Sequence, residues 1–193
     1  MMNRDDILNA AAHEFSQKGF HAASMQDIAQ AVNLQKASLY HHIDSKQEIL
    51  LALLDQALDM LTEHIQTVID QPMPITIKLR EVMRLYLADM LEHRDLASVL
   101  LLEYRSLRDE YRARHILRRD RFEGLWRDMI QEGVDAGVFN STDPGVASRA
   151  LLGVMNWTIT WYHPEGVLTP RQIADQYADL FLSGLLQRGT YDR

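Results

Sequence analysis

The stretch from residue 24 to residue 48 restricts the possible folds of this chain more than any other segment. Ser24 and Asp27 have the spacing of a capping box, so a short helix is predicted to begin there. Asn33 suits the tight turn that would follow, because its short polar side chain tolerates a positive φ angle. A second short helix is predicted over about residues 35–42. Two short helices joined by a tight turn make a helix-turn-helix, whose second helix can lie in a DNA major groove.

Longer helices are predicted on both sides of this stretch. Residues 4–18 carry apolar side chains at the i, i+4 spacing of a single buried helix face. A Ser-x-x-Glu capping box at 45–48 opens another helix, which is predicted to run over residues 46–70 and to couple the N-terminal segment to the rest of the chain. Pro72 and Pro74 end that helix and mark the clearest linker in the sequence.

The remainder of the chain is predicted to be helical throughout. Asp143-Pro144 and Thr169-Pro170 each place a capping side chain directly before a proline, which suits the first position of a helix. No alternation of apolar and polar residues is long enough to argue for a strand. The predicted helices here cover residues 75–92, 96–102, 107–136, 143–162 and 170–186. The expected fold is therefore all-α with about nine helices, divided into a three-helix head, residues 1–48, and a helical body, residues 49–193.

Composition narrows the class of protein further. The 193 residues include no cysteine, which excludes disulfides and thiolate metal sites. No apolar run reaches the roughly 18–20 residues that span a bilayer, and no signal-peptide pattern opens the chain, so we expect a cytoplasmic protein without membrane contact. The sequence contains no phosphate-binding glycine loop, no His-Glu-x-x-His pair and no nucleophile motif. We therefore expect neither an enzyme nor a cofactor or metal site.

The head resembles a known family of proteins. The DNA-binding head of TetR-type transcriptional regulators has a consensus sequence of roughly IAxxAGVSxGxLYxHFxSKxxL. This chain resembles it, with unbroken spacing, at Ile28-Ala29, Leu39-Tyr40-His41-His42-Ile43 and Asp44-Ser45-Lys46. Asn33 replaces the turn glycine of that consensus sequence, Ala37 replaces the glycine of the recognition helix, and Ile43 replaces the phenylalanine. The resemblance covers about the first fifty residues. It implies double-stranded operator DNA as a partner and a small-molecule effector that binds the body.

The recognition helix offers side chains for both bases and phosphates. Gln can pair with adenine, Lys can reach guanine acceptors, and Ala can touch a thymine methyl group. The candidate base contacts are Gln35, Lys36, Ala37 and Ser38, and the candidate phosphate contacts are Ser24, Tyr40, His41 and Lys46. Tyr40 could equally pack in the core of the head. Since the head carries four cations against six acids, we expect its DNA affinity to depend on locally placed cations and neutral donors.

The last two predicted helices differ from the others. Residues 146–161, VASRALLGVMNWTITW, are apolar nearly all round, and a helix of that kind must be covered on all sides. We expect a second copy of the chain to provide the cover, through a four-helix seam of residues 143–163 and 170–187 from each copy. The resemblance implies the same seam. The alternative is that both helices belong to the core of one chain. A homodimer would make the operator a pseudo-palindrome.

An effector cavity is predicted between the long helices of the body. Large apolar side chains with a few polar groups are typical of such cavities, although each of these residues could equally be plain core. Asn156 is the sharpest candidate, because an amide within an apolar helix needs a partner. The candidates are Tyr86, Met90, Tyr104, Arg108, Trp126, Met155, Asn156 and Trp157.

An arginine-rich segment gives the first indication of effector chemistry. Residues 104–121 contain seven arginines against three acids, a local charge of +4 in a chain of net charge −7. Our hypothesis is that this segment receives the phosphates of a coenzyme A thioester whose acyl tail enters the cavity; a solvated helix face with salt bridges is the alternative. The segment GVMNWTITWYHPEG is also similar to regulators of fatty-acid or steroid catabolism within the family.

Together these features predict a ligand-responsive transcriptional regulator that acts as a homodimeric repressor. An apolar or acyl-CoA-like effector would move the helix over residues 46–70 and weaken the operator complex. Two alternatives stay open at this point. One is a regulator of drug efflux that responds to lipophilic compounds, and the other is a helical adaptor that does not bind DNA.

Overall fold

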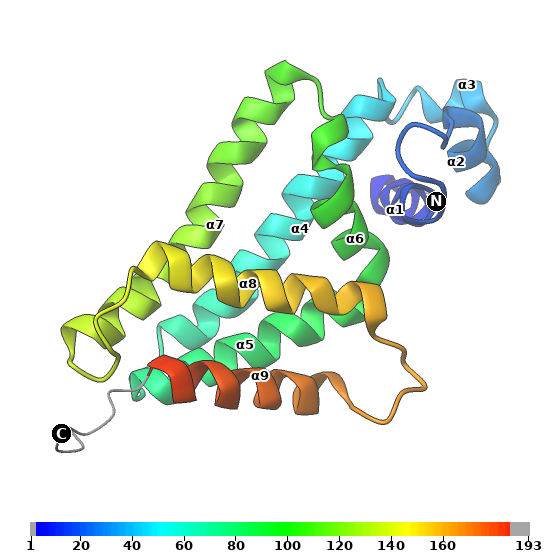
Figure 1. Ribbon diagram of the computed structural model, residues 1–193. Coiled ribbons are helices and arrows are strands. Elements are labelled where there is room, and N and C mark those ends of the chain that lie inside the picture. Colours follow the sequence, from blue (N-terminus) through cyan, green and yellow to red (C-terminus); the bar gives the residue numbers. More distant parts are fainter. Residues whose placement is uncertain (1–2, 186–193) are drawn as a thin grey trace, which may run out of the picture. The chain divides into compact units, whose positions relative to one another are not determined.

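The computed structural model describes residues 3–185, which fold into nine α-helices (Figure 1). A π-helical turn, Val99–Glu103, and a 3-10 turn, Tyr104–Ser106, continue the sixth helix. Among the described residues there is no β-strand, and the all-α prediction is confirmed. The helices are α1 (Arg4–Lys18), α2 (Met25–Ala31), α3 (Lys36–Leu39), α4 (Lys46–Ile69), α5 (Ile75–Glu92), α6 (Arg94–Ser98), α7 (Asp109–Asp135), α8 (Pro144–Trp161) and α9 (Pro170–Leu185).

Two helices differ in length from their predictions. The second helix of the helix-turn-helix was predicted over residues 35–42, but its α-helical part is only Lys36–Leu39. The following residues make tighter turns, in which the His41 and His42 amides donate to carbonyls three residues back, at 3.2 and 3.0 Å. The helix predicted over 96–102 begins earlier, at Arg94, and changes to a π-helical turn at Val99. The predicted end of the last helix, Leu186, lies outside the described residues.

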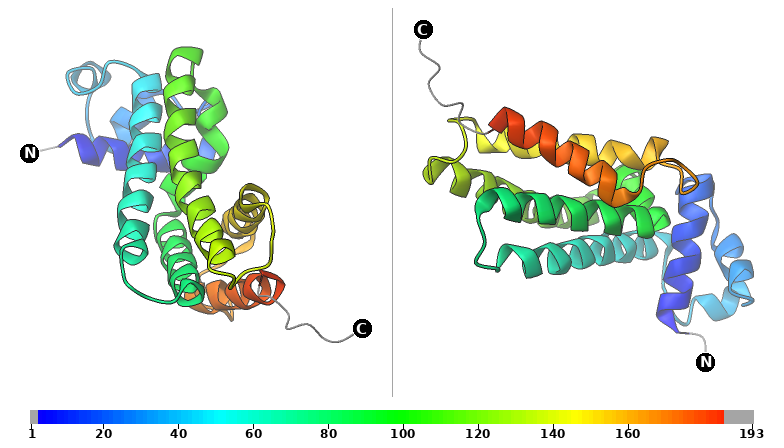
Figure 2. Two further views of the ribbon diagram at one scale, coloured as in Figure 1. Left: turned by 90° about the vertical axis from the view of Figure 1, so that its left-hand side faces the viewer. Right: turned by 90° about the horizontal axis from the view of Figure 1, so that it is seen from below.

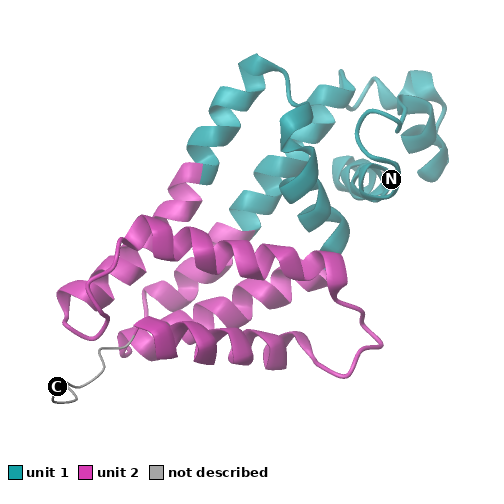
Figure 3. Ribbon diagram, in the orientation of Figure 1, with its two compact units in different colours: residues 1–60, 93–119 teal, residues 61–92, 120–193 magenta. Residues whose placement is uncertain are grey.

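The chain divides into two compact units (Figure 3). Unit 1 comprises the chain up to residue 60 together with residues 93–119, and unit 2 comprises residues 61–92 together with the chain from residue 120. Both α4 and α7 therefore contribute to both units. The predicted boundary at residue 48 falls inside unit 1, and the division into a head and a body at that point stays a prediction.

Unit 1 is built around α1, which packs against α2 and α6 (Figure 2). Its buried face carries Ile7 and Phe15, and the ring of Phe15 meets that of Phe20 edge-on at 5.2 Å. Asn3 caps α1 in a reciprocal capping box with Asp6, a cap that our sequence analysis missed. α2 begins at the predicted Ser24 cap, and α3 packs against it. The turn between them contains Asn33 with φ at 55°, as its short polar side chain allows.

Unit 2 is built around α5, which packs against α9 and α8. α9 buries one stripe that includes Ile173, Ala178 and Leu182, and each large aliphatic side chain in such a stripe contributes roughly 1.5–3 kcal/mol. At the edge of this contact, Arg84 of α5 donates to Asp175 of α9 at 2.5 Å. None of the helices that the structure describes has the length and apolar content needed to span a bilayer.

Candidate functional site

The helix-turn-helix exposes the side chains that were predicted to read bases. Leu39 and Ile43 are buried and hold α3 in the head, whereas Gln35, Lys36 and Ala37 are exposed at its N-terminal end. The fourth candidate, Ser38, is half-buried, and Tyr40 and His41 on the following turn are exposed. The exposed fraction of Tyr40 is 43%, so its ring is not enclosed by the core of unit 1. The face formed by residues 35–37 is therefore free to approach a groove.

Ser24 belongs to a compact hydrogen-bond network at the start of α2. Its Oγ accepts from the backbone amide of Asp27 at 3.1 Å and donates to the Asp27 carboxylate at 2.5 Å. Lys18 also reaches this carboxylate, at 3.1 Å. Hydrogen bonds from Ser24, and then the Lys18 ammonium, lower the pKa of Asp27 to about 2. The Ser24 hydroxyl thus already has partners within the head, and its contact with a DNA phosphate stays a prediction.

Lys46 has a structural position inside unit 1. Its ammonium donates to the backbone carbonyls of Phe20 and Ala23 at 2.6 and 2.7 Å, and reaches that of His21 at 3.4 Å. It also lies 4.3 Å from the centroid of the Phe20 ring. Burial lowers the pKa of Lys46. The ammonium therefore ties the first turn of α4 to the α1–α2 connection, and phosphate contact by Lys46 stays a prediction.

Unit 2 brings together most of the predicted effector-binding residues. The Tyr86 hydroxyl donates to Asn156 Oδ1 at 2.5 Å, and the Tyr86 ring meets that of Trp126 edge-on at 5.3 Å. Burial raises the pKa of Tyr86. Met90 and Met155 are also buried in this unit. The Trp126 indole N–H is buried too, and it has no hydrogen-bond partner among the residues that the structure describes. The Asn156 amide has therefore found a protein partner, as an amide in an apolar helix should.

Three of the predicted effector-binding residues are not in that group. Trp157 lies on the surface of α8 with an exposed fraction of 66%, because it is one position round the helix from Asn156. Tyr104 and Arg108 belong to unit 1, where they flank the start of α7. Sequence periodicity could not separate these residues, since it does not say which face of a helix a neighbouring helix covers.

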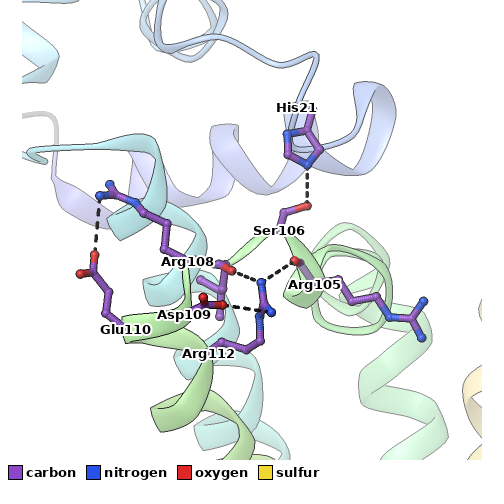
Figure 4. A pocket seen from close by; sticks show the side chains of 8 residues that line it. His21, Arg105, Ser106, Arg108, Asp109, Glu110 and Arg112 are labelled. Carbon is purple, nitrogen blue, oxygen red and sulfur yellow. Dashed lines mark hydrogen bonds and ion pairs between the residues drawn. The ribbon is translucent and has the colours of Figure 1, made fainter.

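Unit 1 contains a pocket of about 570 Å³ at the turn before α7 (Figure 4). Three arginines give it a cationic wall, and Asp109 and Glu110 make exposed pairs with two of them, at 3.2 Å to Arg112 and 3.6 Å to Arg108. His21 reaches into it from the α1–α2 connection, where its Nε2 lies 3.2 Å from Ser106 Oγ. The pocket is lined by His21, Arg105, Ser106, Leu107, Arg108, Asp109, Glu110 and Arg112. The arginine-rich segment was recognised from the sequence, but the contribution of His21 was not.

Gln47 fixes the turn that forms one wall of this pocket. Its amide nitrogen donates to the Ser106 carbonyl at 2.8 Å, and its amide oxygen accepts from the Arg108 backbone N–H at 3.0 Å. Gln47 lies in the first turn of α4, directly after the helix-turn-helix. Its two hydrogen bonds therefore hold the pocket wall to α4. Nothing in the sequence pattern singled out Gln47.

An apolar surface runs along one side of α8. Val146, Val154, Trp157 and Trp161 are exposed at helical spacing, with exposed fractions of 62%, 36%, 66% and 41%, and the small residues Ala150 and Gly153 lie between them. On α9, Leu180 is exposed to 68%. The opposite side of α8, which includes Leu151, Leu152 and Met155, is buried in unit 2. Among the described residues, the helix predicted to be apolar all round is thus covered on one side only.

Comparison with known proteins places these features in a family. The profile of the bacterial regulatory proteins of the tetR family matches residues 7–53, and that of the tetracyclin repressor-like C-terminal domain matches residues 73–185. The transcriptional repressor KstR2 of Mycolicibacterium smegmatis is 30% identical over 189 residues, which cover 95% of this chain and 91% of that protein. The crystal structure of the TetR family regulator PfmR from Thermus thermophilus has a TM-score of 0.85 and 37% identity, covering 94% of this chain and 99% of that one.

A further solved structure shares the fold along most of its length. The structure of AibR in complex with isovaleryl coenzyme A and operator DNA has a TM-score of 0.84 and 30% identity, covering 92% of this chain and 96% of that one. Together with the two matching profiles, these similarities show that the chain belongs to the TetR family of transcriptional regulators.

Proposed function

We propose that this protein is a homodimeric transcriptional repressor that releases a pseudo-palindromic operator when a small apolar or acyl-CoA-like effector binds. The observation that carries the proposal is the exposed face at residues 35–37, on a helix whose other side is anchored by buried Leu39. Exposed Gln and Lys side chains at the start of a recognition helix match the donors that read adenine and guanine in the major groove. The KstR2 relatives, which are named as repressors, support the sign of the effect.

The exposed side of α8 supports the dimer. Two tryptophans and two valines at helical spacing form an apolar surface of a kind that monomers rarely leave open. Ala150 and Gly153 would let a second helix approach closely, since they have small or no side chains. The surface is self-complementary in character, as a two-fold interface requires. Pairing through it would fix the separation of the two recognition helices and therefore the spacing of the half-sites.

The pocket at the turn before α7 supports an anionic effector. Arg108 and Glu110 form an exposed pair, and such pairs contribute little, so the phosphate of a ligand could replace the glutamate. Arginine also suits phosphate better than lysine does, because its planar group can donate two parallel hydrogen bonds. AibR, which is named in complex with isovaleryl coenzyme A, shows that a protein of this fold accepts such a ligand.

The test combines footprinting with an effector titration. DNA upstream of the protein's own gene should show two protected half-sites about one helical turn or a little more apart. Gln35→Ala should weaken that protection, whereas Gln17→Ala, an exposed glutamine on α1, should not. Adding acyl-CoAs of increasing chain length should release the DNA at some length. If the protein protected no duplex, its assignment as a DNA-binding repressor would be wrong. If no acyl-CoA changed the protection, the proposed effector class would be wrong.

A further inference from the structure

His115 of α7 is completely buried, yet among the described residues neither of its ring nitrogens has a hydrogen-bond partner. Buried side-chain nitrogens are paired in the large majority of native structures, because an unpaired buried donor or acceptor loses its hydration without compensation. An apolar side chain of similar size would avoid that loss. The position of His115 therefore needs an explanation other than packing.

The surroundings of His115 favour the neutral form of its imidazole. Burial lowers the pKa of His115, the Arg119 and Arg118 charges lower it further, and only Asp55 acts in the opposite direction. The Asp55 carboxylate is already held by Arg114 at 2.6 Å and by Arg118 at 3.2 Å. A neutral imidazole carries one N–H donor and one acceptor nitrogen. It suits an uncharged polar group better than an anion, which the neighbouring arginines could bind instead.

His115 lies next to the arginine-lined pocket within unit 1. Arg112, which lines the pocket, is three residues before His115 on α7, so both side chains share one face of the helix. The Tyr104 ring lies 6.0 Å from that of His115, and the next residue along the chain, Arg105, again lines the pocket. Along α7, His115 is therefore separated from the pocket-lining Arg112 by less than one helical turn, roughly 5 Å.

We propose that His115 is an effector contact, whose ring N–H donates a hydrogen bond to an uncharged carbonyl oxygen of a ligand anchored by its anionic end in the pocket. This proposal rests on the proposed function, because it assigns one residue of the same effector site. In a coenzyme A thioester the carbonyl oxygen is separated from the phosphates by a flexible linker, so both contacts can form together. His115 would then make the protein bind a thioester more tightly than a ligand that carries the same tail without the carbonyl group.

The test compares two ligands on two proteins by calorimetry. The ligands are hexanoyl-CoA and S-hexyl-CoA, a thioether without the carbonyl oxygen. Wild-type protein should bind the thioester about tenfold more tightly, which is the discrimination that one hydrogen bond to a buried donor supports. His115→Phe should bind both ligands equally, at the thioether level, and should melt at a higher temperature than wild type without ligand. Leu117→Ala, an exposed position on the same helix, should keep the discrimination.

The possible results separate this proposal from the proposed function. Wild-type protein that binds neither ligand would overturn the effector class and this assignment together. Thioester preference that His115→Phe retains would overturn the assignment alone. A His115→Phe protein that melts at a lower temperature and loses affinity for both ligands equally would show a structural role, and would also overturn it. His115→Gln, which keeps a donor, should restore part of the preference.

Discussion

Lys36 and Lys46 are both lysines of the helix-turn-helix segment, but their ammonium groups have different surroundings. Lys36 is exposed at the start of α3, whereas Lys46 donates to main-chain carbonyls inside unit 1. Replacing a residue whose donors satisfy part-buried carbonyls leaves those acceptors without that donor, which costs up to about 1–3 kcal/mol. Replacing the exposed Lys36 removes a candidate base contact and leaves the fold unchanged.

The two lysines should therefore respond differently to the same substitution. Lys46→Met is expected to lower the free energy of unfolding by about 1–3 kcal/mol in urea melts. Lys36→Met should leave stability unchanged and instead weaken operator binding by about 1–3 kcal/mol, with relaxed base preference at one position of each half-site. Equal stability losses in the two variants would show that the carbonyl contacts of Lys46 contribute nothing.

His115 should make the stability of the protein depend on pH in a defined direction. Its folded pKa is lowered, mainly by burial, while the unfolded imidazole titrates near its ordinary value of about 6.5. Above that value both states are neutral and His115 has no effect on the pH dependence. Below it the unfolded state binds a proton that the folded state resists, so stability falls as the pH falls.

Urea melts of wild type and His115→Phe between about pH 7.5 and pH 5.5 measure this effect. The stability advantage of His115→Phe should grow as the pH is lowered, because that variant lacks the titrating group. Other histidines titrate in both proteins and cancel in the difference. An advantage that is constant over this range would mean that the imidazole takes up its proton equally well in both states.

At the level of the elements, the turn after α7 packs against Gly133 in the last part of that helix. The amides of Val138 and Phe139 both donate to the Gly133 carbonyl, at 3.0 and 2.9 Å, and the Phe139 ring lies against the Gly133 Cα. A Cβ atom at Gly133 would lie 2.1 Å from the ring of Phe139, a side chain that is only 1% exposed. Gly124 on the same helix is different, because its nearest neighbour is the flexible end of Arg127 at 3.4 Å.

These two glycines give a matched pair of substitutions. Gly133→Ala should lower the melting temperature, with a loss of about 1–3 kcal/mol from overpacking. Gly124→Ala should be neutral or stabilising by up to about 1 kcal/mol, since alanine favours the helix interior. Thermal melts of the two variants and of wild type measure this difference. Equal melting temperatures would mean that Phe139 moves aside at little cost.

Most helices could be predicted because their ends depend on local chemistry. Helix caps act within one helical turn, so they can be recognised from residues that are close in the sequence. This holds for the capping side chains of Ser24, Asp143 and Thr169 and for the prolines that follow two of them. The contacts that build the candidate sites act over longer separations. Gln47 meets Ser106, and Lys46 meets Phe20 and Ala23, through side chains whose partners are main-chain atoms and leave no pattern in the sequence.

At the level of the whole molecule, charge and assembly bear on the same function. The chain has a net charge of −7, so its general attraction to DNA is weak, and in the proposed dimer specific binding comes from two correctly spaced recognition helices. Two linked heads bind far more tightly than one, because the second head binds at a high effective concentration. Any change that separates the two copies should therefore reduce operator affinity without altering a single DNA contact.

Trp157→Glu tests that dependence, because it places a charge on the most exposed of the four large apolar side chains of the α8 surface. Sedimentation should show wild-type protein at twice the chain mass and Trp157→Glu at a higher monomer fraction, with operator affinity lowered by at least about tenfold at the same concentration. Ile77→Glu is the matched control, since Ile77 is also an exposed apolar residue, at 49%, but lies on α5 rather than on α8. Both variants should keep the helical content of wild type, because each side chain is already in contact with solvent. Wild-type protein that sediments as a single chain, or Trp157→Glu protein that remains dimeric and binds the operator normally, would show that α8 does not form the seam.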